Sequence, residues 1–161
     1  MMNINIICVG KLKEDYLKSA CAEYIKRINA SAKISVIELD ESRLSEKPSD
    51  KEIANALQTE AKVFEKHISS GKCFNIAMCI EGKMISSEEL AAKFNDISLS
   101  GKSTINFLIG SSFGLDEDLK RKCDFKLSVS KMTFPHQLFR VMLLEQIYRC
   151  LSINAGSKYH K

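Results

Sequence analysis

The sequence is short of glycine and proline, and it has no apolar run long enough to cross a membrane. Seven glycines and two prolines among 161 residues, with 45% hydrophobic and 27% charged residues, exclude a disordered or fibrous chain. The longest uncharged apolar runs, such as residues 3–10 and 104–110, have the length of a strand and fall far below the roughly 20 residues that span a bilayer. We therefore expect a single domain over residues 1–161, with a core of ordinary size and no membrane contact.

Two further signals are missing. The first residues lack the basic region and the long apolar stretch of a secretory signal, so we expect a cytoplasmic protein. The six cysteines form no CxxC pair and the three histidines stand at no ligand-like spacing from them, which disfavours a disulfide framework and a zinc site. We expect reduced thiols in the core and no bound metal. The cysteines are Cys8, Cys21, Cys73, Cys79, Cys123 and Cys150.

Positive charge is concentrated in the last quarter of the sequence, although the net charge of the whole chain is only +4. Residues 1–118 contain 15 Lys and Arg against 18 Asp and Glu, a net charge of −3, whereas residues 119–161 contain 9 against 2, a net charge of +7. A basic segment on a mildly acidic body is typical of a protein that binds a polyanion. The alternative is a solvated, lysine-rich surface without such a partner.

Short apolar runs alternate with helical periods along the chain. Two capping boxes, Ser49 with Glu52 and Ser86 with Glu89, mark the starts of two helices. This order predicts an α/β fold with a mostly parallel sheet and flanking helices on both faces. The expected strands are residues 4–9, 33–39, 73–80, 104–109 and 125–129, and the expected helices are residues 15–28, 50–68, a segment that begins after Ser86, 116–122 and 136–153.

The last predicted helix has apolar residues in nearly every direction around its axis, so it has no solvent face. Such a helix must be covered on both sides, and the sheet of so small a chain covers only one. We therefore expect a homodimer in which a second copy of the helix provides the other cover, with Leu143 and Ile147 on the shared face. Glu145 and Arg149, four residues apart, are interpreted as a structural ion pair rather than a catalytic one.

Two loops have the composition of a ligand site. Residues 109–115, with Gly110 and Gly114, follow a strand at the end where α/β proteins bind ligands, but they form neither a GxGxxG motif nor a P-loop. Residues 127–137 leave a strand through a loop that could wrap a small molecule and then enter the last helix. The alternatives are a simple turn for the first segment and an ordinary strand-to-helix turn for the second.

The C-terminal tail, residues 154–161, is a third candidate. It ends in an aromatic ring, an imidazole and a cation. Tyr159 and His160 can stack on or hydrogen-bond a base, and Lys158 and Lys161 can meet phosphates. The alternative is an ordinary frayed chain end.

Several motifs spread over the whole chain form one recognisable set. They are Val9-Gly10-Lys11-Leu12, Glu81-Gly82-Lys83, Ile109-Gly110 with Gly114, the block 127–137 followed by Arg140-Val141, Glu145-Gln146-Ile147-Tyr148-Arg149, and Tyr159-His160-Lys161. Together they resemble the bacterial ribosomal RNA large subunit methyltransferase H family, which belongs to the SPOUT class of knotted methyltransferases. The most specific parts of the resemblance are residues 131–137 and the Tyr-His-Lys terminus.

The resemblance implies an enzyme that methylates N3 of a pseudouridine in 23S rRNA, with S-adenosylmethionine as the methyl donor. It also implies a homodimer that acts on assembled ribosomes and has no DNA partner. A deep trefoil knot is implied at the C-terminal end, with the donor bent among the knot loops. The residues that the resemblance assigns to the donor are Met78, Gly110, Val129, Ser130, Lys131, Met132, Thr133 and Phe134.

Methylation of N3 requires the loss of a proton, because the imide of a uracil ring is protonated at neutral pH. We expect His160 to be the base and Tyr159 to pack on the nucleobase. Arg140 or Lys161 would steady negative charge on the ring oxygens. The alternative is that His160 only orients the RNA and that solvent takes the proton.

Two other functions stay open on the sequence alone. A non-catalytic rRNA-binding or ribosome-binding protein of the same fold would keep the basic tail without using a donor. A flavodoxin-like binder of a small molecule would share the alternating order of strands and helices. Donor binding separates the first alternative from the enzyme, and flavin absorbance would reveal the second.

Overall fold

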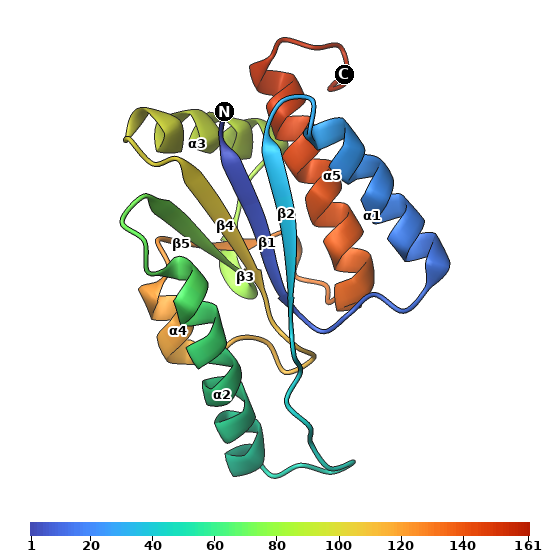
Figure 1. Cartoon of the computed structure of the whole chain (residues 1–161), viewed down its shortest axis with the longest axis vertical. Helices are drawn as coiled ribbons and strands as arrows, with labels where there is room; N and C mark the ends of the chain where they lie inside the picture. The colour runs from blue at the N-terminus through green and yellow to red at the C-terminus, as the bar shows by residue number, and fades with distance from the viewer.

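The computed structural model describes the whole chain, residues 1–161 (Figure 1). Five parallel strands form one sheet, in the order β2-β1-β4-β3-β5. A helix follows every strand, as the alternating sequence pattern predicts. The strands are β1 (Asn3–Val9), β2 (Lys33–Leu39), β3 (Cys73–Met84), β4 (Thr104–Ile109) and β5 (Phe125–Ser128). The helices are α1 (Asp15–Ile28), α2 (Asp50–Ile68), α3 (Ser87–Leu99), α4 (Glu117–Lys122) and α5 (His136–Asn154).

Helices cover both faces of the sheet and create two apolar clusters. Successive side chains of a strand point to opposite faces, so Ile4 and Ile6 of β1 pack into the first cluster whereas Ile7 packs into the second. The first cluster contains residues of α1, α3 and α5, and the second contains residues of α2 and α4. In Figure 1, α1 and α5 lie side by side. The predicted α/β fold with flanking helices is therefore confirmed, and the sheet is parallel throughout.

Both predicted capping boxes are present. The Ser49 hydroxyl accepts a hydrogen bond from Glu52 N at 3.2 Å, and Ser86 accepts one from Glu89 N at 3.1 Å. In each box the glutamate carboxylate accepts a bond from the backbone N–H of the serine in return. These bonds satisfy amide groups that the first helical turn leaves without partners, so α2 and α3 begin where the sequence predicts.

β3 is longer than predicted, because it pairs with β5 twice. Met78 is paired with Leu127, and after a shift in register Lys83 is paired with the same Leu127. The second pairing brings the two backbones very close, since a Cβ on Gly82 would lie 2.6 Å from the carbonyl carbon of Leu127. Only glycine fits there, and the hydrophobic pattern that ends at Ile80 gives no sign of this second pairing.

The predicted environment of α5 needs a correction. We expected the chain itself to cover only one side of this helix, but α1 and α3 also pack along its flanks. Leu143 and Ile147 are fully buried in the core of the same chain, so they do not lie on a face shared with a second copy. An apolar strip of α5 is still accessible, with Leu138 41% exposed and Met142 half-buried.

All six cysteines are free thiols. Cys8, Cys21 and Cys150 are buried, and the other three are half-buried. No helix combines the length with the apolar composition that crossing a membrane requires.

Candidate active site

A cavity of about 380 Å³ lies at the carboxyl ends of β4 and β5, beside residues 78–81 of β3. It contains seven of the eight residues that the resemblance assigns to the methyl donor; Lys131 is the one that does not line it. The carboxyl ends of parallel strands lie at the same edge of a sheet, which explains why loops distant in sequence converge there. The lining residues are 78–81, 109–115, Lys120, 127–130, 132–134, His136 and Phe139.

Gly110 allows the loop after β4 to fold back on itself. A Cβ on this residue would lie 2.2 Å from the carbonyl oxygen of Gly114, closer than any real contact. Ser111 and Gly114 form an isolated antiparallel bridge, and Gly114 has a φ of +84°. The segment is thus a tight turn and also a wall of the cavity.

The loop after β5 is held in shape by its own serines. The Ser128 hydroxyl donates to the carbonyl of Ser130 at 3.0 Å, and the Ser130 hydroxyl accepts from Met132 N at 3.0 Å. Large apolar side chains nevertheless stay exposed beside the cavity, namely Val129, Met132 and Phe113. An exposed apolar group at the edge of a cavity is a typical contact for a flat organic ligand.

Sequence reasoning missed an ion pair in the cavity wall. Lys120 of α4 lines the cavity and donates to Glu81 Oε1 at 2.5 Å and to Glu117 Oε1 at 3.0 Å. Burial alone would lower the pKa of Lys120, but the two carboxylates outweigh burial and raise it. The hydrogen bond from Lys120 also lowers the pKa of Glu81. Glu117, three residues before Lys120 in a short helix, was the available sequence signal.

The C-terminal tail folds back onto α5 and is not frayed. Arg149 donates to Glu145 Oε1 at 2.6 Å, which confirms the predicted structural pair, and the Tyr159 hydroxyl donates to the same oxygen at 3.1 Å. The Arg149 guanidinium also lies 4.8 Å from the centre of the Tyr159 ring. Burial, followed by the bond to Glu145, raises the pKa of Tyr159 to about 12.

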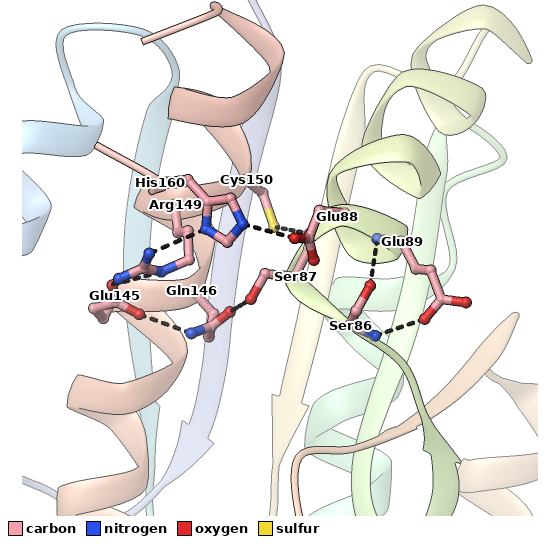
Figure 2. A network of polar contacts seen from close by, with 9 residues as sticks. All are labelled: Ser86, Ser87, Glu88, Glu89, Glu145, Gln146, Arg149, Cys150 and His160. Atoms are coloured by element: carbon pink, nitrogen blue, oxygen red, sulfur yellow. Dashed lines mark hydrogen bonds and ion pairs between the residues drawn. The ribbon is translucent and has the colours of Figure 1, made fainter. Parts of the chain in front are cut away.

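His160 bridges α3 and α5, as Figure 2 shows. Its Nε2 lies 2.7 Å from Glu88 Oε1, and its Nδ1 lies 3.1 Å from Arg149 Nη1. Arginine can only donate, so Nδ1 must accept and the ring proton must sit on Nε2, where it is donated to Glu88. His160 therefore has both ring nitrogens engaged, and its hydrogen bond lowers the pKa of Glu88.

Arg140 does not meet the tail within one chain. Its side chain is 4% exposed, and it donates from Nη1 to Glu38 Oε2 at 2.8 Å and from Nη2 to the carbonyl of Gly10 at 3.1 Å. Glu38 also accepts from Leu12 N at 3.2 Å. In the single chain, Arg140 thus ties the first turns of α5 to the loop after β1.

The tail and the cavity at the ends of the strands are also separate within one chain. His136 and Phe139 of α5 line the cavity, whereas the tail reaches back only to Glu145, about 9 Å further along the helix axis. A second cavity, of about 530 Å³, lies between them and shares residues 127–129 with the first. The structure therefore brings together seven of the eight residues that the resemblance assigns to the donor and places Tyr159 and His160 elsewhere.

Acids from the body of the chain pair with four cations of the basic C-terminal segment, whereas Arg149 pairs with Glu145 inside the segment. Five of its nine Lys and Arg side chains form ion pairs: Lys120, Arg121, Lys122, Arg140 and Arg149. The remaining four have no carboxylate within 4.0 Å, and these are Lys126, Lys131, Lys158 and Lys161. The charge that can meet a polyanion is thus smaller than the count along the sequence indicates.

Comparison with known proteins gives the family. The family model described as "Predicted SPOUT methyltransferase" matches residues 2–160. A relative from Methanococcus maripaludis is 52% identical over 160 residues, which cover 99% of this chain and 100% of the relative. Relatives named ribosomal RNA large subunit methyltransferase H, from Clostridium novyi and Bifidobacterium adolescentis, are each 49% identical with the same coverage. The chain therefore belongs to the SPOUT methyltransferases and, within them, to the family of ribosomal RNA large subunit methyltransferase H.

Solved structures of distant proteins share the fold. A probable methylase family protein from Haemophilus influenzae has a TM-score of 0.58 at 13% identity, over 99% of this chain and 71% of that chain. A probable methyltransferase from Bordetella pertussis has a TM-score of 0.55 at 9% identity, over 93% of this chain and 96% of that chain.

Proposed function

We propose that the chain transfers a methyl group from S-adenosylmethionine to N3 of a pseudouridine in 23S rRNA of the large ribosomal subunit. The observation that carries the proposal is the cavity at the ends of β4 and β5 and beside residues 78–81 of β3, which gathers seven of the eight donor residues implied by the family. Relatives about half identical over their full length carry the name of a large subunit rRNA methyltransferase. The enzyme, rather than a non-catalytic RNA-binding protein, best accounts for a preserved donor cavity.

The residues present suit the donor. A cavity of about 380 Å³ falls within the range of small-molecule sites. Exposed Val129 and Met132 offer apolar contacts to a purine, and the close turn at Gly110 brings backbone groups to the wall. The donor supplies a methyl group already activated by its sulfonium, so the protein contributes mainly position, and the transfer needs no metal.

A deep trefoil knot in the C-terminal part of the chain belongs to the proposal. It is supported by the path of the chain, because β5 lies at the edge of the sheet beside β3, whereas α5 packs against α1 and α3. The segment between β5 and α5 must therefore travel back across the sheet, as can be followed in Figure 1. Threading of that segment through the preceding loops would hold the donor loops rigidly together.

His160 is the proposed base that removes the N3 proton. A base must offer a lone pair, and the contact of His160 Nδ1 with Arg149 Nη1 orients a ring nitrogen that can accept. Tyr159 packs on the nucleobase, and Lys161 steadies the negative charge on the ring oxygens. Arg140 acts as a positioning residue, since its guanidinium is committed to Glu38 and Gly10.

A homodimer completes the site. One chain does not bring its tail to its own donor cavity, and the strip of α5 around Leu138 and Met142 stays partly exposed. A second copy related by a two-fold axis would cover this strip and bring the partner's tail toward the donor cavity. The pseudouridine would then lie between the donor cavity of one chain and the tail of the other.

The proposed partner is 23S rRNA within the assembled ribosome, which places the enzyme in the cytoplasm, with no DNA partner. Four cations free of carboxylate partners support an RNA contact: Lys131 beside the donor loop, Lys126 on β5, and Lys158 and Lys161 in the tail. Two of them belong to the same tail as the proposed base. Phosphate contacts at these positions would make binding sensitive to salt.

A tritiated-methyl transfer assay on assembled ribosomes, separate subunits and stripped rRNA tests this function. We expect label in 23S rRNA with assembled ribosomes as the best substrate. Label that appears equally on naked RNA would contradict the dependence on the ribosome. Absence of S-adenosylmethionine binding in calorimetry, together with retained ribosome binding, would favour the non-catalytic RNA-binding protein.

A further inference from the structure

An ion pair with a nearly buried lysine forms part of the donor cavity, outside the residues that the family assigns to the donor. The side chain of Lys120 is only 9% exposed, and its Nζ donates to Glu81 and to Glu117. Glu81 lines the cavity and is 53% exposed, whereas Glu117 does not line it. The cavity wall thus presents an accessible carboxylate, while the ammonium group behind it is nearly covered.

Glu81 is more than a partner for Lys120. Glu117, on the same helix as Lys120, already supplies a carboxylate at 3.0 Å. Glu81 comes from β3 and uses Oε1 for Lys120, while its Oε2 has no partner on another residue. Lys126 of β5 is also close enough to affect Glu81, but it has no carboxylate within 4.0 Å. Glu81 is therefore held at the cavity wall with an oxygen available to a ligand.

The charge of the donor changes during the proposed reaction. S-adenosylmethionine has a sulfonium, an ammonium and a carboxylate, so its net charge is positive. Methyl transfer to N3 leaves the electron pair of the broken S–C bond on sulfur, and the proton of N3 goes to the base. The product, S-adenosylhomocysteine, is a thioether with no net charge. A carboxylate in the cavity wall therefore attracts the donor more strongly than the product.

We propose that Glu81 makes the cavity select the cationic donor over its neutral product, and that Lys120 is a positioning residue that holds the Glu81 carboxylate in place. This inference rests on the proposed use of S-adenosylmethionine. It assigns a specificity role to a residue outside the donor loops. It also gives a physical reason for product release, because the attraction is lost once the methyl group has left.

Calorimetric titration of the intact protein with S-adenosylmethionine and with S-adenosylhomocysteine tests the inference. Glu81→Gln should weaken donor binding about tenfold, because it removes a negative charge that attracts the cationic donor, and should leave product binding nearly unchanged. Glu117→Gln is the matched control, because it also removes one partner of Lys120 but does not line the cavity. It should leave the ratio of the two affinities as in the wild type.

The salt dependence of the wild-type protein provides a measurement that needs no variant. Donor affinity should fall with rising ionic strength more steeply than product affinity. Equal weakening of both ligands by Glu81→Gln, an equal change in Glu117→Gln, or identical salt dependence of both ligands would overturn the inference. A wild-type protein that binds neither ligand would instead overturn the proposed function, and the inference with it.

Discussion

Nη1 of Arg149 lies 3.1 Å from Nδ1 of His160, and this contact covers the only lone pair that the neutral imidazole can offer to a proton. In this arrangement Arg149 blocks the ring nitrogen that would accept the proton. If the contact between His160 and Arg149 breaks, Arg149 still has a hydrogen-bond partner, because its Nε and Nη2 both donate to Glu145 Oε1. Substrate binding that draws His160 away from Arg149 therefore costs one hydrogen bond and leaves no buried charge without a partner.

The docking of the tail can be followed through the ionisation of Tyr159. Its pKa is raised to about 12, first by burial and second by the hydrogen bond to Glu145. A raised pKa in the folded state means that this stabilisation is fully present below the ordinary value of 10.0 and is lost as the pH rises through about 12. Glu145→Gln should lower the pKa of Tyr159 toward its ordinary value, as measured by the ultraviolet absorbance of tyrosinate.

Two further variants make that titration specific. Tyr159→Phe identifies the transition that belongs to this residue among the four tyrosines. Glu65→Gln removes a carboxylate that pairs with Lys122, far from the tail, and should leave the transition in place. An unchanged transition in Glu145→Gln would show that the tail is not docked through Glu145.

Gly110→Ala should damage the donor cavity. The added Cβ would lie 2.2 Å from the Gly114 carbonyl oxygen, so the loop after β4 must move. We expect a loss of about 2 kcal/mol in the free energy of unfolding and a loss of donor binding. Denaturant unfolding and calorimetry measure the two effects. Gly71→Ala is the control, since no atom lies within 4 Å of its Cβ position, and donor binding that is retained in Gly110→Ala would contradict the assignment.

Arg140→Ala should act mainly on stability. It leaves the carboxylate of Glu38 and the carbonyl of Gly10 without their buried donor, which should lower the free energy of unfolding by about 3 kcal/mol. Denaturant unfolding measures the loss, and the double variant with Glu38→Gln should recover part of it. A fully stable Arg140→Ala protein that has lost methyl transfer would instead favour direct contact with the nucleobase.

Leu138→Glu should disrupt the proposed dimer. Leu138 is 41% exposed on the apolar strip of α5, so a charge there tests association without entering the core. We expect a folded monomer in sedimentation experiments. Leu99→Glu, at an 86% exposed position at the end of α3, is the control and should remain dimeric. If Leu138→Glu sediments as the wild type does, the dimer is not formed through this strip.

Much of the fold could be predicted because local signals agree with it. The capping boxes at Ser49 and Ser86 determine two helix starts, and apolar runs mark the buried parallel strands. The elements that pack around α5 could not be predicted, because the periodicity of a helix shows which of its faces are apolar but not which elements lie against them. The second pairing of β3 with β5 was missed because it depends on a close backbone approach at Gly82.

Some parts of the candidate site could be predicted from the sequence and others could not, because contacts between distant segments leave no local signal. Loops at the carboxyl ends of strands are found by topology and by resemblance, whereas ion pairs between distant segments are not visible in a sum of charges. Arg140 and Glu38 are 102 residues apart, and Lys120 and Glu81 are 39 apart. Such pairs involve three of the nine cations of the basic C-terminal segment, Lys120, Lys122 and Arg140, and one of them places an unforeseen carboxylate in the donor cavity.

The most direct test of the whole account is the rate of methyl transfer from S-adenosylmethionine to 23S rRNA in ribosomes, compared between the wild type and His160→Ala. A positioned base contributes about 100-fold or more to such a rate. We expect the variant to lose at least that factor while its affinity for S-adenosylmethionine, measured by calorimetry, stays at the wild-type value. Methylation of ribosomes by His160→Ala at the wild-type rate would contradict the proposed base.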